Sequence, residues 1–175
     1  MRSINVAVSA TLVAVSAAGG VGMAPSAWAY YDPAINGTYT ATVIGSWAQT
    51  NQVYHQESVV RSTWRITSSC STAQDCTGQV ASDQGWTAPM VMNDGALWTV
   101  RHDIPNWETC PDGTSFIGAD VFWFVAVNPD TGETLLNQPG APVLAGRNHT
   151  TGPSGVCGTN APLYIDQPFR LDKIG

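Results

Sequence analysis

Side-chain polarity alternates with a period of two along most of the chain beyond residue 36. Residues 37–47, 59–67 and 96–104 each present one mostly apolar face and one face of threonine, arginine or aspartate. Alternation of this kind predicts β-strands with one packed side and one solvated side. The faces predicted to be packed consist of Tyr39, Ala41, Val43 and Trp47, then Val60, Ser62, Trp64 and Ile66, and then Ala96, Trp98, Val100, His102 and Ile104.

Residues 121–127 are apolar on both faces, which predicts a central strand or one covered on both sides. Asn93-Asp94-Gly95 predicts a hairpin, since Asp-Gly tolerates the positive φ angles of a type I′ turn. Residues 128–132 predict a second hairpin, and residues 169–173 predict a last strand that closes the sheet. We therefore expect an all-β fold, a single antiparallel barrel or sandwich of about eight strands. The barrel is favoured because a sheet of this size otherwise leaves free edges.

Two segments lack alternation, residues 105–115 and residues 146–162. The second is rich in glycine, asparagine, threonine and proline. We expect both to be loops. Loops of this length are usually either functional or pinned to the rest of the protein.

The first 29 residues have the composition of a signal peptide. Arg2 supplies a positive charge, residues 4–21 are apolar without a charged side chain, and Ala27-Trp28-Ala29 offers the small residues that a signal peptidase accepts. An uncleaved anchor is the alternative, but no basic stop-transfer cluster follows the apolar stretch. We predict cleavage after Ala29, which leaves a single β-rich secreted domain over residues 30–175 and no membrane span.

The charge balance is acidic. The chain has thirteen Asp and Glu against seven Lys and Arg, a net charge of −6. Loss of Arg2 with the signal peptide brings the net charge to about −7. Nucleic acids and anionic membrane surfaces both attract basic surfaces, so neither is an expected partner.

All four cysteines follow the predicted cleavage site, and an even number in an exported chain predicts disulfides. Three pairings are possible. We favour Cys70–Cys76 with Cys110–Cys157, because the first pair brackets a short polar turn. A four-cysteine metal site is disfavoured, since no two cysteines have the C-x-x-C spacing.

No motif in the sequence specifies a catalytic or cofactor chemistry. The sequence lacks a Gly-x-Ser-x-Gly elbow, closely spaced histidines for a metal and a phosphate-binding glycine loop, so we expect no metal and no cofactor. We expect His55 on a solvated segment and His102 partly buried with one hydrogen bond. His149, beside Arg147 in the second expected loop, is the most plausible ligand contact among the histidines.

Six tryptophans follow the predicted cleavage site, and aromatic faces suit sugars and apolar ligands. The alternation places Trp47, Trp64, Trp98 and Trp123 in the core. Trp86 and Trp107 are the expected exposed aromatic contacts. The candidate ligand-binding set is therefore Trp86, Trp107, Glu108, Arg147 and His149.

Three stretches resemble small exported proteins of mycobacteria and related actinobacteria. They are Gly37-Thr38-Tyr39-Thr40, Ser82-Asp83-Gln84-Gly85-Trp86 and residues 104–113. The resemblance implies a secreted or cell-envelope location and assigns no functional residue.

Three functions remain in consideration. The first is an exported module that binds a small molecule or an envelope protein without catalysis, presented on loops pinned by a disulfide. The second is a small envelope hydrolase that uses Glu108 or Asp112 with His149, which requires these side chains to converge. The third is a structural or host-facing surface protein with a solid interior and an apolar external patch.

Overall fold

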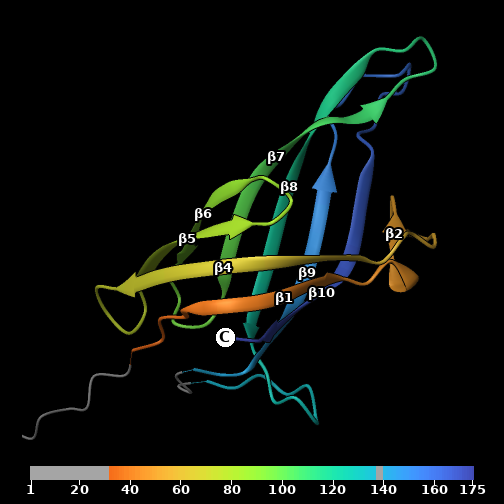
Figure 1. The fold of residues 1–175 in the computed structure, drawn as a ribbon. Helices are drawn as coiled ribbons and strands as arrows, with labels where there is room; N and C mark the ends of the chain where they lie inside the picture. Colours follow the sequence, from red (N-terminus) through yellow and green to blue (C-terminus); the bar gives the residue numbers. More distant parts are fainter. Residues whose placement is uncertain (1–31, 137–139) are drawn as a thin grey trace, which may run out of the picture.

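The computed structural model describes residues 32–136 and 140–175, so the predicted signal peptide lies outside the described residues. Ten β-strands and one 3₁₀ turn make up the regular structure of the described part (Figure 1). The elements are β1 (Gly37–Val43), η1 (Gly45–Trp47), β2 (Gln49–Thr50), β3 (Val53–Tyr54), β4 (Val60–Cys70), β5 (Cys76–Ser82), β6 (Thr87–Met92), β7 (Trp98–Thr109), β8 (Ser115–Ala126), β9 (Val143–Thr151) and β10 (Tyr164–Lys173).

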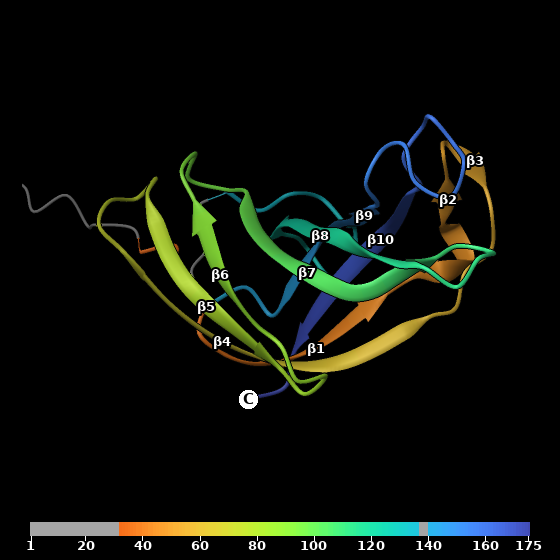
Figure 2. The ribbon, with the colours of Figure 1, turned by 90° about the horizontal axis from the view of Figure 1, so that it is seen from above.

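Eight of the strands form a closed antiparallel barrel. The neighbours follow the order β1-β4-β5-β6-β7-β8-β9-β10, and β1 pairs with β10 to close the ring. The closing register runs from Tyr39 opposite Lys173 to Val43 opposite Phe169. The β2–β3 hairpin lies outside this ring against the first half of β10 (Figure 2). The prediction of an all-β barrel is confirmed.

The apolar core fills the barrel around its aromatic residues. Trp64 on β4 contacts Phe122 on β8 edge to face, with ring centroids 4.8 Å apart, and Phe169 on β10 at 5.1 Å. Of the residues expected on the packed faces, Trp64 and Ile66 of β4 and Trp98 and Val100 of β7 are buried, because successive side chains of a strand point to opposite faces, whereas Val60 is 42% exposed. The largest fully buried side chains are Trp64, Tyr39, Phe124, Phe169, Ile66, Met90, Met92, Leu144, Leu171, Val80 and Val100.

Two of the four tryptophans predicted for the core lie elsewhere. Trp47 is 70% exposed, because the chain leaves β1 at Val43 and enters η1 before the alternation reaches it. Trp123 is half-buried on the outer face of β8, where its ring lies 4.1 Å from that of His149. The doubly apolar run therefore packs Phe122 and Phe124 inside and places Trp123 on the outside.

The first predicted hairpin exists, but its turn differs from the expectation. The last paired residues of β6 and β7 are Val91 and Thr99, so the connection is longer than a two-residue type I′ turn. The carboxylate of Asp94 accepts hydrogen bonds from the backbone N–H groups of Ala96 and Leu97 and so stabilises this longer loop. In the second predicted hairpin, Val127 pairs with Thr134 across a single bridge.

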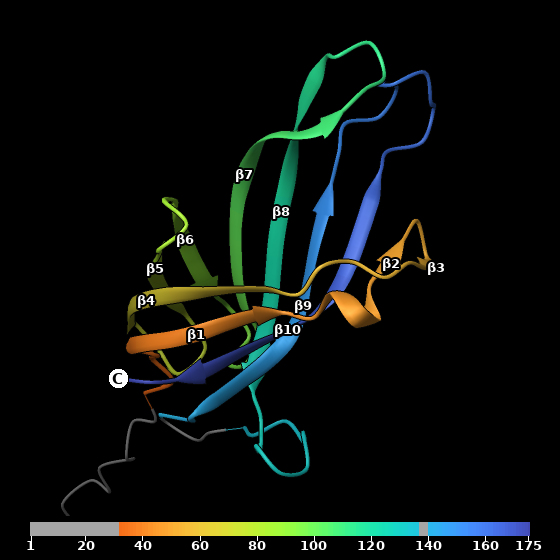
Figure 3. The same cartoon turned by 45° about the vertical axis from the view of Figure 1, so that its right-hand side comes forward.

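The two segments expected to be loops are strands in part: residues 110–114 and 152–162 connect strands, and the residues before them belong to β7 and β9. β7 continues to Thr109 after a register shift between Ile104 and Glu108, and β9 continues to Thr151. The β7–β8 hairpin and the β9–β10 connection extend together beyond the rest of the barrel (Figure 3). The disulfide Cys110–Cys157 joins their tips. The other disulfide is Cys70–Cys76, so the pairing favoured from sequence is the one present.

Candidate functional site

A cavity of about 630 Å³ opens into the barrel beside the aromatic core. Sites for small molecules in proteins usually measure about 300–1,000 Å³, so this volume suits a compact organic ligand. Side chains from β1, β4, β7, β8, β9 and β10 line the cavity, together with the β5–β6 turn. The lining residues are Ala41, Val43, Val60, Ser62, Trp64, Gln84, Gly85, Trp86, His102, Asp103, Ile104, Pro105, Trp107, Asp120, Phe122, Asn148, Thr150, Gln167 and Phe169.

A buried carboxylate, Asp120 on β8, is the centre of the polar wall of the cavity. The residue is 4% exposed. Its Oδ1 atom accepts hydrogen bonds from Asn148 Nδ2 at 2.6 Å and from Thr150 Oγ1 at 2.8 Å. Its Oδ2 atom lies 3.1 Å from His102 Nε2. A buried charge is tolerated only when paired and hydrogen-bonded, and three partners from two neighbouring strands meet that condition here.

The register of the sheet explains why these four residues meet. Asp120 is paired directly with His102 on β7 and with Thr150 on β9. Residues opposite each other in an antiparallel pair point to the same face, so all three side chains point into the barrel. Asn148 is two residues before Thr150 and therefore points inward as well.

Both ring nitrogens of His102 face oxygen atoms. Nε2 lies 3.1 Å from the carboxylate of Asp120, and Nδ1 lies 3.3 Å from the backbone oxygen of Asp103. His102 therefore has one close contact to the buried carboxylate and a second, longer contact to a backbone oxygen, one more than the single hydrogen bond expected from sequence.

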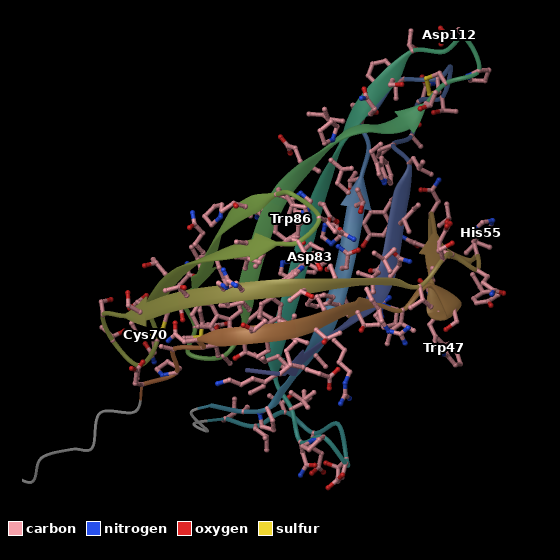
Figure 4. The ribbon with its side chains drawn as sticks, in the orientation of Figure 1. Trp47, His55, Cys70, Asp83, Trp86 and Asp112 are labelled. Carbon is pink, nitrogen blue, oxygen red and sulfur yellow. A yellow bond between two sulfur atoms is a disulfide. The ribbon has the colours of Figure 1, made fainter. Side chains whose placement is uncertain are left out.

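Aromatic rings form the other wall of the cavity. Trp86, from the β5–β6 turn, stacks on His102 with ring centroids 4.1 Å apart and an interplanar angle of 15°. The edge of Trp64 meets Trp86 at 5.2 Å. Figure 4 labels Trp86 at the β5–β6 turn. The ring of Trp86 thus covers the His102–Asp120 pair and limits its contact with water.

Trp107 lines this cavity, and Glu108 follows it on β7 without being one of the lining residues. A Cβ atom on Gly118 would come within 2.7 Å of the Trp107 ring, and one on Gly152 would come within 2.3 Å of Glu108 Oε2. The two side chains therefore occupy space that these glycines leave free. Glu108 Oε2 is buried and has no hydrogen-bond partner among the described residues. Of the five residues predicted to bind a ligand, Trp86 and Trp107 line the cavity and Glu108 lies beside Trp107.

Arg147 and His149 lie on the outside of the barrel, not in a loop as expected. Both are on β9, and since Asn148 and Thr150 point inward, Arg147 and His149 point outward. The His149 ring packs against Trp123 and Tyr164. Burial lowers the pKa of His149 below its usual 6.5, an effect only partly opposed by the negative charges of Asp166 and Asp120. These two residues do not share a site with the other three.

The residues proposed for a hydrolase do not converge. Asp112 is at the exposed tip of the β7–β8 hairpin (Figure 4). Hydrogen bonds from the hydroxyl and backbone N–H of Thr114 lower the pKa of its carboxyl group, as in an ordinary turn. His149 is on the outer face of β9, whereas the carboxylate of Glu108 lies against Gly152. His55 is exposed, as expected, and its Nδ1 atom contacts Glu57.

Neither a metal site nor a membrane helix is found in the described part of the chain. Within residues 32–136 and 140–175, no three histidine, cysteine or acidic side chains gather in a way that could hold a metal ion. The same residues contain no helix of the length and hydropathy needed to cross a bilayer.

The sequence did not lead to a prediction of the polar network around Asp120, although it contains one sign of it. Asp120 occupies the same phase of its strand as Phe116, Phe122 and Phe124. A lone acidic residue in the apolar phase of a strand must find partners inside the fold. That signal could have identified Asp120, but its partners His102, Asn148 and Thr150 follow only from the strand register.

Comparison with known proteins gives a fold and no family. No family model matches the chain, and no curated protein matches its sequence. Among solved structures, the chain is similar to the monomer form of the sensor domain of PknI from M. tuberculosis, with a TM-score of 0.52. The two are 12% identical, and the match covers 81% of this chain and 88% of the other. The chain therefore shares the β-barrel architecture of that domain, and at this identity the likeness extends to the fold alone.

Proposed function

We propose that this chain is an exported, non-catalytic β-barrel domain that binds a small organic ligand in the cavity lined by Trp86, His102 and Asp120. The observation that carries the proposal is the cavity itself. It combines an aromatic wall with a fully paired polar network, which is the usual composition of a small-molecule site. A binding domain needs no reactive group, and the network holds its charges in stable pairs.

The proposed location outside the cytoplasm rests on three observations. The first 29 residues have the composition of a signal peptide. Two disulfides are typical of an oxidising compartment. The barrel is also similar in fold to a domain described as a sensor domain. Its resemblance to small exported proteins of mycobacteria agrees with a place in the cell envelope or the culture fluid.

The proposal is tested by blocking the cavity. N-phenyl-1-naphthylamine, a neutral dye that fluoresces in apolar surroundings, is titrated into the purified domain with its disulfides intact. Ser62 lines the cavity, and the neighbouring Thr63 points outward on the same strand. We expect Ser62→Phe to weaken dye binding at least about tenfold, because the added ring occupies the cavity. Thr63→Phe is the matched control and should leave dye binding unchanged. Equal binding by both variants would refute the proposal.

A second candidate is binding of an envelope protein at the β2–β3 hairpin. Two large apolar side chains are exposed on it, Val53 at 69% and Tyr54 at 63%, and Trp47 of η1, just before β2, is 70% exposed. Exposed apolar groups that gather at one place mark interaction surfaces in many soluble proteins. Cross-linking in the producing cells, with wild type and with Trp47→Ser plus Tyr54→Ser, tests this candidate. The double variant is expected to lose one specific cross-linked species, and an unchanged pattern would exclude this surface.

A further inference from the structure

The charges around the cavity are unbalanced. Two acidic residues, Asp103 and Asp120, are among the lining residues, and none of the lining residues within the described chain is a lysine or an arginine. A third acidic side chain, Glu108, is not one of the lining residues but follows Trp107 on β7, and both side chains lie against Gly152. The only basic group on the lining is His102, and its Nε2 atom already faces Asp120.

The pairing of His102 with Asp120 leaves no positive charge for a ligand. His102 faces Oδ2 of the Asp120 carboxylate through Nε2, and Asn148 and Thr150 donate hydrogen bonds to Oδ1 of the same carboxylate. Glu108 differs, because its buried Oε2 atom has no partner among the described residues. An anionic ligand would lose its hydration in this cavity without gaining a counter-charge, which is costly in surroundings of low dielectric constant.

The aromatic rings favour the opposite charge. Trp64, Trp86, Trp107, Phe122 and Phe169 all line the cavity. The face of an aromatic ring is negative, and tryptophan attracts cations most strongly, with a larger effect where water is excluded. Walls of tryptophan with a nearby unpaired carboxylate are the arrangement that recognises organic ammonium groups.

We propose that the ligand of this cavity is an organic cation, an alkylated ammonium group carried on an apolar body. The ammonium group lies against Trp107, on the side of the cavity nearest the carboxylate of Glu108, and the apolar body packs against Phe122 and Phe169. This inference rests on the proposed function, because it names the chemical class of ligand for the same cavity.

The test uses three probes of nearly equal shape that displace N-phenyl-1-naphthylamine from the wild-type domain. The cation is phenethyltrimethylammonium, the neutral carbon isostere is 3,3-dimethylbutylbenzene, and the anion is 3-phenylpropanoate. We expect the cation to displace the dye at a concentration about tenfold lower than the isostere, and the anion to be the weakest of the three. Displacement by the cation no better than by the isostere, or no displacement by any probe, overturns the inference.

Two charge variants identify the carboxylate responsible. Glu108→Gln keeps the shape of the side chain and removes its charge, so the preference for the cation over the isostere should fall about threefold. Asp130→Asn removes the same charge from an exposed turn between β8 and β9 and should leave the preference unchanged. An equal effect of both variants would assign the preference to the overall charge of the protein and refute the site.

The two proposals fail in different ways. In one outcome the dye binds the wild type, Ser62→Phe prevents that binding, and the cation displaces the dye no better than the isostere. The cavity then binds small molecules, but without a preference for organic cations. If the dye does not bind the wild type, or binds Ser62→Phe equally well, then the proposed function fails and the inference fails with it.

Discussion

Replacing Asp120 by alanine is the most direct test of the buried network. The substitution leaves His102, Asn148 and Thr150 without the carboxylate that now accepts their hydrogen bonds. Removing a buried carboxylate that has three partners costs about 3–5 kcal/mol, because the remaining groups stay buried and unpaired. We therefore expect Asp120→Ala to lower the free energy of unfolding by about 4 kcal/mol.

Equilibrium unfolding in urea, with both disulfides oxidised, measures this loss. With a slope of about 2 kcal/mol per molar urea, a loss of about 4 kcal/mol lowers the midpoint by about 2 M. Asp120→Asn keeps one oxygen acceptor of the same shape, so a smaller loss of about 1–2 kcal/mol is expected. Thr150→Val removes a single hydrogen bond and should cost about 1 kcal/mol.

The control is Asp130→Ala, which removes an exposed carboxylate and should change stability by less than about 0.5 kcal/mol. A loss below about 1 kcal/mol for Asp120→Ala would refute the reasoning, because a buried carboxylate with three partners cannot be removed so cheaply. Additive effects of Asp120→Ala and Thr150→Val in the double variant would also contradict it, since bonded partners must couple.

Three further predictions concern other parts of the barrel. Burial lowers the pKa of His149 below 6.5, so just below that pH the unfolded chain binds a proton that the folded chain does not. The stability of the fold should therefore fall as the pH drops below 6.5. In His149→Gln the urea midpoint, measured between about pH 5 and pH 8, should depend less on pH. Replacing Cys110 and Cys157 by serine opens a loop with a sequence separation of 47 and should cost about 4 kcal/mol, measured as a lower melting temperature. Gly118→Ala places a Cβ 2.7 Å from the Trp107 ring; we expect a loss of about 1–3 kcal/mol and a changed near-ultraviolet circular dichroism spectrum.

Each of these predictions has a result that would contradict it. An unchanged pH slope in His149→Gln would mean that another group titrates, and His55→Gln, at an exposed histidine, is the matched control. A melting temperature unaffected by loss of Cys110–Cys157 would remove the disulfide as a stabiliser of the extension. If Gly118→Ala has the spectrum and stability of the wild type, the Trp107 ring does not pack against that glycine.

The barrel could be predicted from sequence because most of its strands bury one apolar face. β4 and β7 have alternating apolar residues from Trp64 to Ile66 and from Trp98 to Val100, and both strands point these residues inward. The prediction that Trp47 is buried was wrong, because alternation in the sequence does not show where a strand ends. β1 ends at Val43, and η1 turns the chain before Trp47.

The candidate site could be predicted only in part, for a physical reason. The inward residues of β9 near the cavity are Gly146, Asn148 and Thr150. A strand is usually recognised in a sequence by an apolar inward face, and this part of β9 has none. Because hydrophobic alternation is missing there, the sequence predicted a loop, and His149 was predicted to contact a ligand from it. Trp86 and Trp107, which the alternation does not assign to the core, both line the cavity, and Trp86 also packs against the core, so their role in binding stays a prediction. The Asp120 network depends on which residues of three different strands lie opposite each other. The spacing of residues within one segment carries no information on that register.

The pairing of β1 with β10 also constrains how the chain can fold. These strands are almost at opposite ends of the described sequence, yet Tyr39 lies opposite Lys173 and the backbone N–H of Thr38 donates to the oxygen of Gly175. During synthesis β10 emerges after every other strand, so one edge of β1 has no partner until the end. Folding should be slow for a domain of this size, because the decisive contacts are remote in sequence. A chain truncated before β10 would expose two open edges, which makes it prone to aggregation and proteolysis.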